Sequence, residues 1–310
     1  MLLTHLRAGH ALSLALLLAG PNALAAQAPP GVDSVRLLRD LSILAHDSME
    51  GRAPATAGGA RARAFLEREL AAAGARGPST GMARPFEWTE GSGVNLVGRL
   101  PGRAPSDHVV VLSAHYDHIG VRNGQVFNGA DDNASGAAAL LEIARQVAAE
   151  PLSHTLVVVL LDAEERGSRG ARAFIADPPV PLDRIALNVN LDMVARTGGL
   201  LWAGGAYHTP ALRPILEAVA ARAPLTLRLG HDRPGAPEGD DWTNQSDHGV
   251  FHEQGIPFVY FGVEDHPDYH RPTDDFERVN PGEYVASVRT ILMGLRALDE
   301  ALPLPAAAPR

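Results

Sequence analysis

Two kinds of apolar pattern alternate along most of the chain. Residues 109–112 and 156–161 are unbroken apolar runs, which are typical of strands buried on both faces of a parallel sheet. Residues 185–191 alternate between apolar and polar side chains, and residues 256–261 contain a further apolar run, so both segments are predicted strands. Helical patterns separate several of these runs, which favours a sheet whose strands are mostly parallel.

Apolar residues at helical spacing lie between and around the predicted strands. Residues 32–45, 59–73 and 134–149 are predicted helices, and the second has one apolar face made by Ala62, Phe65, Leu66, Leu70 and Ala73. The sequence NPGE at 280–283 supplies an N-cap, a proline for the first turn and a capping acid, so a last helix is predicted to begin there. Residues 77–93 are rich in Gly, Pro, Ser and Thr and predict a loop. The predicted architecture is one α/β domain with a mostly parallel central sheet flanked by helices.

The first 28 residues have the pattern of a secretory signal peptide. Arg7 supplies the positive start, residues 11–19 form a short apolar run, and small residues suited to cleavage follow at 23–28. The alternative is an uncleaved anchor, although the run is too short to span a bilayer.

The remaining segment, residues 29–310, is expected to be a single domain, with a frayed Pro/Ala-rich tail from about residue 303. It contains no other run long enough to span a membrane, which takes roughly 18 apolar residues. The protein is therefore expected to be secreted or periplasmic.

Composition removes several classes of function. The 27 basic and 36 acidic residues give a net charge of −9, every basic residue is arginine, and no basic run occurs, so a nucleic-acid partner is not expected. The chain has no cysteine, which excludes disulfides and thiolate metal ligands. Any metal site must therefore use His, Asp and Glu.

Side chains that can bind metals follow the predicted strands, where each strand ends. They are His115, Asp117, His118, the pair Glu164 and Glu165, Asp192, and the segment Asp268-Tyr269-His270, with Asp131, Asp132 and Asn133 in between. Ligand sites in open α/β sheets form at the carboxyl ends of strands, so these groups are expected to meet. Carboxylates gathered at one point repel one another, and zinc, which accepts imidazole and carboxylate ligands, removes that repulsion.

Six segments, in order, carry a resemblance to a known family: SAHYDHIG, GADDNASG, DAEERGSRGA, LNVNLDMV, SDHGVF and HPDYHRPTDD. With LAHDSMEGRAPATAGG upstream, the chain resembles the two-zinc exopeptidases typified by secreted bacterial leucyl aminopeptidases. That family also contains glutamate carboxypeptidases, glutaminyl cyclases and the non-enzymatic transferrin receptors. Related two-metal carboxypeptidases and deacylases share parts of the pattern, but they lack the GADDNASG form and usually carry an inserted dimerisation domain.

The resemblance implies a metal centre with two zinc ions per chain. His115, Asp132 and Asp192 resemble the ligands of one ion, and Asp132, Glu165 and His270 resemble those of the other, so Asp132 bridges. The alternative for the acids near Asp132 is to cap the following helix, a role expected of Asp131 or Asn133.

The resemblance also implies three catalytic roles. Glu164 resembles the general base, Asp117 the carboxylate that orients the His115 imidazole, and Tyr269 a tyrosine that stabilises the oxyanion. Asp247 and His248 are expected to support the site rather than bind metal, and Met193 either belongs to the core or lines a pocket. His118, His231, His252 and His266 receive no role.

The implied function is a secreted or periplasmic aminopeptidase that acts on peptide substrates. A glutaminyl cyclase with one zinc, held by Asp132, Glu165 and His270, is the first alternative; the presence of His115 and Asp192 argues against it. A carboxypeptidase that uses Arg166, Arg169 or Arg196 is the second. The third is a non-enzymatic binding protein, which is disfavoured because no ligand is missing. The oligomeric state and the preferred substrate residue are not predicted.

Overall fold

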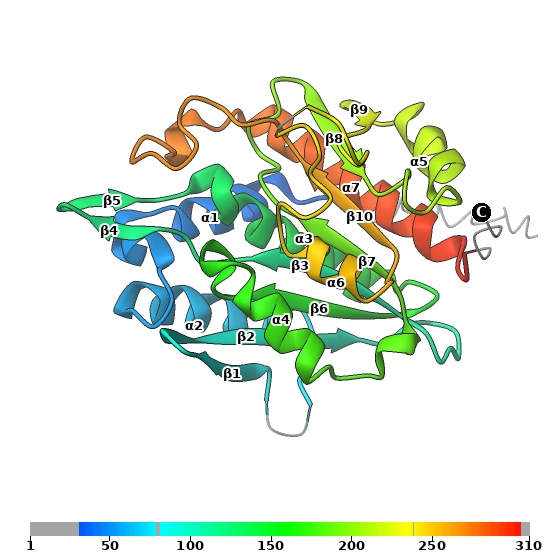
Figure 1. The fold of residues 1–310 in the computed structure, drawn as a ribbon, viewed down its shortest axis with the longest axis horizontal. Coiled ribbons are helices and arrows are strands. Elements are labelled where there is room, and N and C mark those ends of the chain that lie inside the picture. The colour runs from blue at the N-terminus through cyan, green and yellow to red at the C-terminus, as the bar shows by residue number, and fades with distance from the viewer. Residues whose placement is uncertain (1–30, 79–80, 238, 305–310) are drawn as a thin grey trace, which may run out of the picture.

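The computed structural model of the chain describes residues 31–78, 81–237 and 239–304. The expected signal peptide at 1–28 lies outside these residues. Within them, a central sheet is covered by helices on both faces (Figure 1). The sheet order is β1 (Ala83–Trp88), β2 (Gly91–Leu100), β6 (Thr155–Leu161), β3 (Val109–His115), β7 (Ile185–Leu191), β10 (Phe258–Gly262), β8 (Leu200–Gly204) and β9 (Thr226–Leu229).

The middle of the sheet is parallel, as predicted. Strands β6, β3, β7 and β10 all run in one direction, and their carboxyl ends reach the same edge of the sheet. Antiparallel pairing occurs between β1 and β2, between β2 and β6, and between β10 and β8, so the whole sheet is mixed. The four parallel strands carry the predicted metal-binding side chains at their exits.

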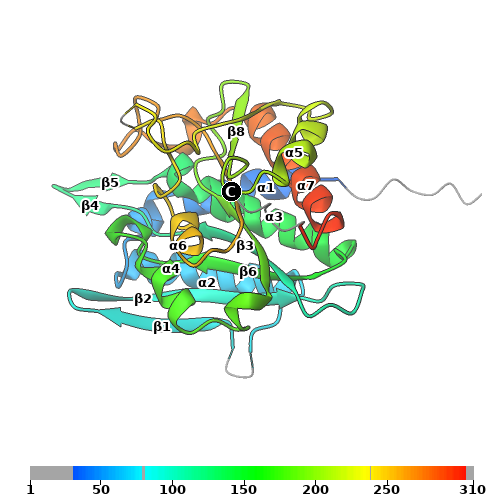
Figure 2. The ribbon, with the colours of Figure 1, turned by 45° about the vertical axis from the view of Figure 1, so that its right-hand side comes forward.

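Alternate residues of the buried strands pack into two separate apolar layers, one on each face of the sheet. On β3, Val110 and Leu112 face the larger layer, which contains α1 (Ser34–Leu44), α2 (Ala57–Ala72), α3 (Gly136–Ala149), α5 (Leu212–Ala220) and α7 (Pro281–Glu300). Val109 and Val111 face the smaller layer with α4 (Arg169–Ala176) and α6 (His248–Glu253). Figure 2 shows α4 and α6 on one side of the sheet and α3 and α7 on the other. Because both faces are covered, the strand sequence is an unbroken apolar run.

The predicted start of the last helix is confirmed. The Asn280 side chain accepts hydrogen bonds from the backbone N–H groups of Gly282 at 3.0 Å and Glu283 at 3.3 Å, and α7 begins at Pro281. At the other end, Leu304 still packs against the core; the rest of the expected frayed tail lies outside the described residues.

The loop predicted over residues 77–93 is wrong for most of its length. Strand β1 and the start of β2 lie there, joined by a tight turn and paired in register from Ala83–Leu96 to Trp88–Gly91. Strand β1 is half-exposed at the edge of the sheet, so it lacks the apolar run of a buried strand and tolerates Pro85. The strand forms because it pairs with β2, and amino-acid composition alone does not predict this pairing.

Two further features bear on the site. A small hairpin of β4 (Gly120–Arg122) and β5 (Gln125–Phe127) follows His118 and returns the chain to the loop that contains Asp132. Among the described residues, none of the helices combines the length and apolar character needed to span a bilayer.

Candidate metal centre

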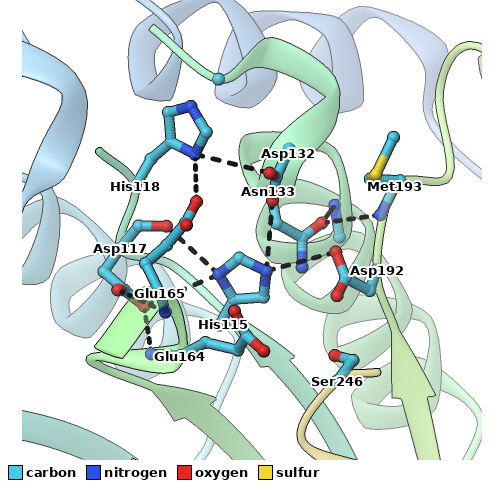
Figure 3. A network of polar contacts seen from close by, with 12 residues as sticks. His115, Asp117, His118, Asp132, Asn133, Glu164, Glu165, Asp192, Met193 and Ser246 are labelled. Carbon is cyan, nitrogen blue, oxygen red and sulfur yellow. Dashed lines mark hydrogen bonds and ion pairs between the residues drawn. The ribbon is translucent and has the colours of Figure 1, made fainter. Parts of the chain in front are cut away.

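The candidate centre lies where β3, β6 and β7 end, at the edge of the sheet from which the β4–β5 hairpin projects (Figures 1 and 3). His115 is the last residue of β3, and Asp192 directly follows β7. Glu164 and Glu165 form a short turn after β6, and Asp132 lies in the loop that precedes α3. His270 comes from the loop after β10.

The first predicted ligand set meets in the structure. His115 Nε2 lies 3.2 Å from Asp192 Oδ1 and 3.4 Å from Asp132 Oδ1, and all three side chains are buried. Donors held tetrahedrally around zinc at its usual bond lengths are about 3.3 Å apart. The spacing and the chemistry of these three groups therefore fit a zinc ion.

The second predicted set meets on the other oxygen of the same aspartate. His270 Nε2 lies 3.0 Å from Asp132 Oδ2 and 3.4 Å from Glu165 Oε2. Because Asp132 presents one carboxylate oxygen to each set, it has the position of a bridging ligand. The His270 side chain is 40% exposed, so this side of the centre is open to solvent.

Protons on the histidines offset the carboxylate charges. Burial alone raises the pKa of Glu165, but His118 and His270 outweigh burial and lower that pKa to about 2. Contacts with Asp132 and Glu165 raise the pKa of His270 to about 10. Burial lowers the pKa of His115, yet Asp192, Asp117 and Asp132 together raise it well above its ordinary value. The site is thus built to attract positive charge.

These shifts predict that zinc uptake releases protons. With a pKa of about 10, His270 keeps its proton at neutral pH until an ion replaces it, because zinc binds only the neutral ring. A raised pKa means that acid favours the protonated, metal-free centre, so zinc affinity should fall as pH falls. Titration calorimetry in buffers of different ionisation enthalpy should count the released protons. A count of zero would contradict this electrostatic account.

Asp117 connects the exits of two strands. Its carboxylate accepts hydrogen bonds from the backbone N–H groups of Glu164 at 3.0 Å and Glu165 at 3.3 Å. His115 Nδ1 lies 3.2 Å from the backbone oxygen of Asp117 and 3.6 Å from its carboxylate. One residue therefore contacts the His115 ring and fixes the turn that carries both glutamates.

The adjacent glutamates point in different directions (Figure 3). Glu165 faces His118 and Asp132, whereas Glu164 extends below the His115 ring. Burial raises the pKa of Glu164 well above its ordinary value, and Asp247 and Asp192 add to the increase. Glu164 belongs to neither ligand set and lies beside the first one, which suits a group that transfers protons.

Tyr269 also borders the centre. Its ring stacks on His270 with centroids 3.9 Å apart and an interplanar angle of 24°. Burial, with Asp132 and Asp192 nearby, raises the pKa of its hydroxyl, so the group stays protonated and able to donate a hydrogen bond.

The loop that contains Asp132 is held by its neighbours. Asn133 Oδ1 accepts from the Gly136 N–H at 2.8 Å, which caps the start of α3, and from the Met193 N–H at 3.2 Å. Asp131 instead reaches the β7 exit, where it accepts from the Ala195 N–H at 2.7 Å. Of the two proposed helix caps, Asn133 takes that role, and Asp131 joins two loops. The Met193 side chain belongs to the core.

Arg52 lies behind the centre and was not predicted. It is completely buried and donates to the backbone oxygens of Tyr116 at 2.8 Å, Leu44 at 2.8 Å, Asn128 at 2.5 Å and Gly129 at 2.9 Å. Burial lowers the pKa of Arg52 to about 10, against the influence of Asp132, Asp117, Asp274 and Glu165. This guanidinium joins the segments on either side of the β4–β5 hairpin to the last residue of α1.

Asp247 and His248 lie beside the centre without joining either ligand set. Both are buried, and the two Asp247 carboxylate oxygens have no hydrogen-bond partner among the described residues. Burial raises the pKa of Asp247 to about 8, with Asp117 and Asp192 contributing. The His248 Nε2–H donates to the backbone oxygen of Trp242 at 2.8 Å, and burial lowers the pKa of His248 to about 3.

The chain matches the model of peptidase family M28 over residues 95–295 and therefore belongs to that family. Aminopeptidase YwaD of Bacillus subtilis is 28% identical over 203 residues, which cover 62% of this chain and 42% of that protein. The chain thus spans less than half the length of this relative.

Solved structures share the fold. A Zn-dependent exopeptidase from Parabacteroides distasonis aligns with a TM-score of 0.68 and 21% identity over 87% of this chain and 99% of its own. A glutaminyl cyclase from Porphyromonas gingivalis aligns with a TM-score of 0.69 and 20% identity, also over 87% and 99%.

Proposed function

We propose that this protein is a two-zinc aminopeptidase. One observation carries the proposal: two sets of zinc-binding side chains share Asp132, and Glu164 lies beside them without belonging to either. Membership of a peptidase family, and similarity to an aminopeptidase, support a hydrolytic reaction on peptides.

Zinc held by these residues would polarise the scissile carbonyl and make a water molecule more acidic. Glu164 accepts the proton of the attacking water and passes it to the leaving amine. Asp117 holds the Glu164 backbone in place during this transfer. The Tyr269 hydroxyl donates a hydrogen bond to the oxygen that gains negative charge.

Glutaminyl cyclisation is the second candidate, because a cyclase shares the fold. It requires no hydrolytic water. The buried contact between His115 and Asp192, with Asp117 behind the ring, favours hydrolysis, since it completes the first ligand set, which a cyclase with one zinc on the second set does not need. The same complete set disfavours a binding protein without activity.

A carboxypeptidase needs a cation for the substrate carboxylate. Arg196 forms an ion pair with Asp268, with 2.6 Å between the guanidinium nitrogen and the carboxylate oxygen. The Arg169 side chain donates a hydrogen bond to the backbone oxygen of Arg166. Arg166 itself lines a pocket of about 320 Å³ with Trp88, beside the turn after Glu165. Two of the three arginines considered from the sequence thus have other partners, which favours amino-terminal trimming.

The proposal predicts which end of a peptide is trimmed. The protein saturated with zinc should contain close to two equivalents of metal and should trim an amidated peptide, whereas acetylation of the amino terminus should block cleavage. Elemental analysis measures the metal content, and mass spectrometry of the products measures cleavage of the two peptides. The reverse pattern would indicate a carboxypeptidase, and one zinc with release of a pyroglutamyl product would indicate a cyclase.

We also propose that the protein acts outside the cytoplasm, on the basis of the signal-like sequence at 1–28. Cell fractionation combined with amino-terminal sequencing of the mature protein tests this proposal.

A further inference from the structure

His118 is a buried histidine that faces the second ligand set. Its side chain has no exposed surface, and its Nδ1 lies 2.7 Å from Glu165 Oε1 and 3.6 Å from Asp132 Oδ2. Neither ring nitrogen has a hydrogen-bond partner among the described residues, so even the short contact with Glu165 is not aligned as a hydrogen bond. A buried imidazole without hydrogen bonds is costly unless another partner binds it.

The fold provides a niche for this ring. Gly129, which precedes the bridging-ligand loop, has a φ of +55°, and a Cβ there would lie 2.5 Å from His118 Cδ2 and 2.6 Å from Cγ. A side chain at residue 129 would therefore displace the imidazole, and also the Asp132 backbone oxygen, which would lie 2.0 Å from the same Cβ atom. The rings of His118 and His270 have centroids 5.8 Å apart, and both contact the same two carboxylates.

We propose that His118 is a direct ligand of the second zinc ion, in addition to Asp132, Glu165 and His270. The proposal rests on the zinc centre of the proposed function, but not on which peptides are cleaved. His118, Asp132 and Glu165 place donor atoms close enough together to hold one ion. Each Glu165 oxygen faces an imidazole nitrogen, so both rings offer a donor atom beside the same carboxylate.

The two metal positions then differ in character. Four protein donors at the His118 side resemble the closed set of a structural zinc site, whereas His115, Asp132 and Asp192 leave a coordination position open, as in catalytic sites. The His118 side should bind zinc first and tightly, and the His115 side should bind more weakly. The weakly held ion is the one beside Glu164.

Zinc affinity tests the proposal directly. His118→Phe keeps the ring volume and removes both nitrogens, and competition with a chromophoric chelator measures both binding constants. We expect the tighter constant to weaken by more than about 100-fold, beyond the roughly 10- to 100-fold typical of groups that only support a ligand. Visible absorption of the cobalt-substituted protein should also change, because the ion loses a ligand. His118→Asn, with a donor oxygen near the Nδ1 position, should recover part of the affinity.

His252→Phe is the matched control, since His252 packs on Phe258 away from the centre and should bind both ions normally. Circular dichroism of the metal-free variants establishes whether they fold. If His118→Phe does not fold, the zinc-binding constants of His118→Asn are compared with those of the original protein instead. Unchanged zinc constants and an unchanged cobalt spectrum would overturn the proposal. A wild-type protein that binds zinc as expected but trims no peptide would instead contradict only the proposed function.

Discussion

Replacing Glu164 with glutamine should reduce kcat by about 100- to 10,000-fold, the usual contribution of a general acid–base group, and leave both zinc ions bound. The expected loss follows from its position, because Glu164 lies beside the first ligand set and outside both. Glutamine has nearly the same shape but cannot accept the proton of water. Steady-state kinetics and elemental analysis of the same preparation measure the two results.

The neighbouring residue supplies the control. Glu165→Gln changes the same functional group one position along the chain, but it weakens a ligand that contacts both His118 and His270. We expect this variant to retain about one equivalent of zinc after dialysis. If the Glu164 variant loses metal and the Glu165 variant does not, the two roles are reversed.

Arg52→Leu should lower the free energy of unfolding by at least about 3 kcal/mol, since a buried acceptor left without a donor costs about 1–3 kcal/mol and the backbone oxygens of Leu44, Tyr116 and Asn128 lose theirs, whereas that of Gly129 keeps the Ala134 N–H. For a chain of this size that corresponds to a melting temperature about 6–12 °C lower. Leucine fills much of the space, so the effect reports lost hydrogen bonds more than an empty cavity. Thermal unfolding followed by circular dichroism measures the shift.

The same substitution at Arg68 is the control, because that guanidinium is largely exposed and an ion pair such as the one it makes with Glu69 contributes little in contact with solvent. Arg68→Leu should change the melting temperature by only about 1–2 °C. Equal effects at the two positions would show that the four buried hydrogen bonds do not stabilise the fold.

The sequence predicted the site better than the edges of the fold. His115 and Glu165 lie at the ends of strands with clear apolar runs, and Asp192 follows a strand with a clear alternating pattern, so their meeting at one edge follows from parallel order. Strand β1 has no such run, because an edge strand is half-exposed. Strands β8 and β9 and the helices α4, α5 and α6 are short. Segments of that length contain too few apolar positions for periodicity to tell a helix from a strand.

His118 and Arg52 could not be assigned from sequence for a different reason. The direction of the His118 ring depends on how the β4–β5 hairpin returns and on the missing side chain at Gly129. Arg52 donates only to backbone oxygens, which have no signature in the sequence. In both cases the contacting groups are far apart in the sequence and are brought together only by the fold, so residue type alone does not identify them.

Residues with positive φ occur at three strand exits that form the centre. Ala163 (φ 60°) precedes the glutamate pair, Met193 (φ 55°) follows Asp192, and His270 (φ 54°) is itself a predicted ligand. Such conformations cost about 1–3 kcal/mol each in residues other than glycine. Laboratory selection for heat tolerance therefore has a simple first solution, which is glycine at Ala163, because it removes the penalty without removing a zinc-binding group or a large core side chain. Glycine at Ala163 would also make the turn that orients Glu164 more flexible, so greater heat tolerance and slower turnover would both come from the loss of one Cβ atom.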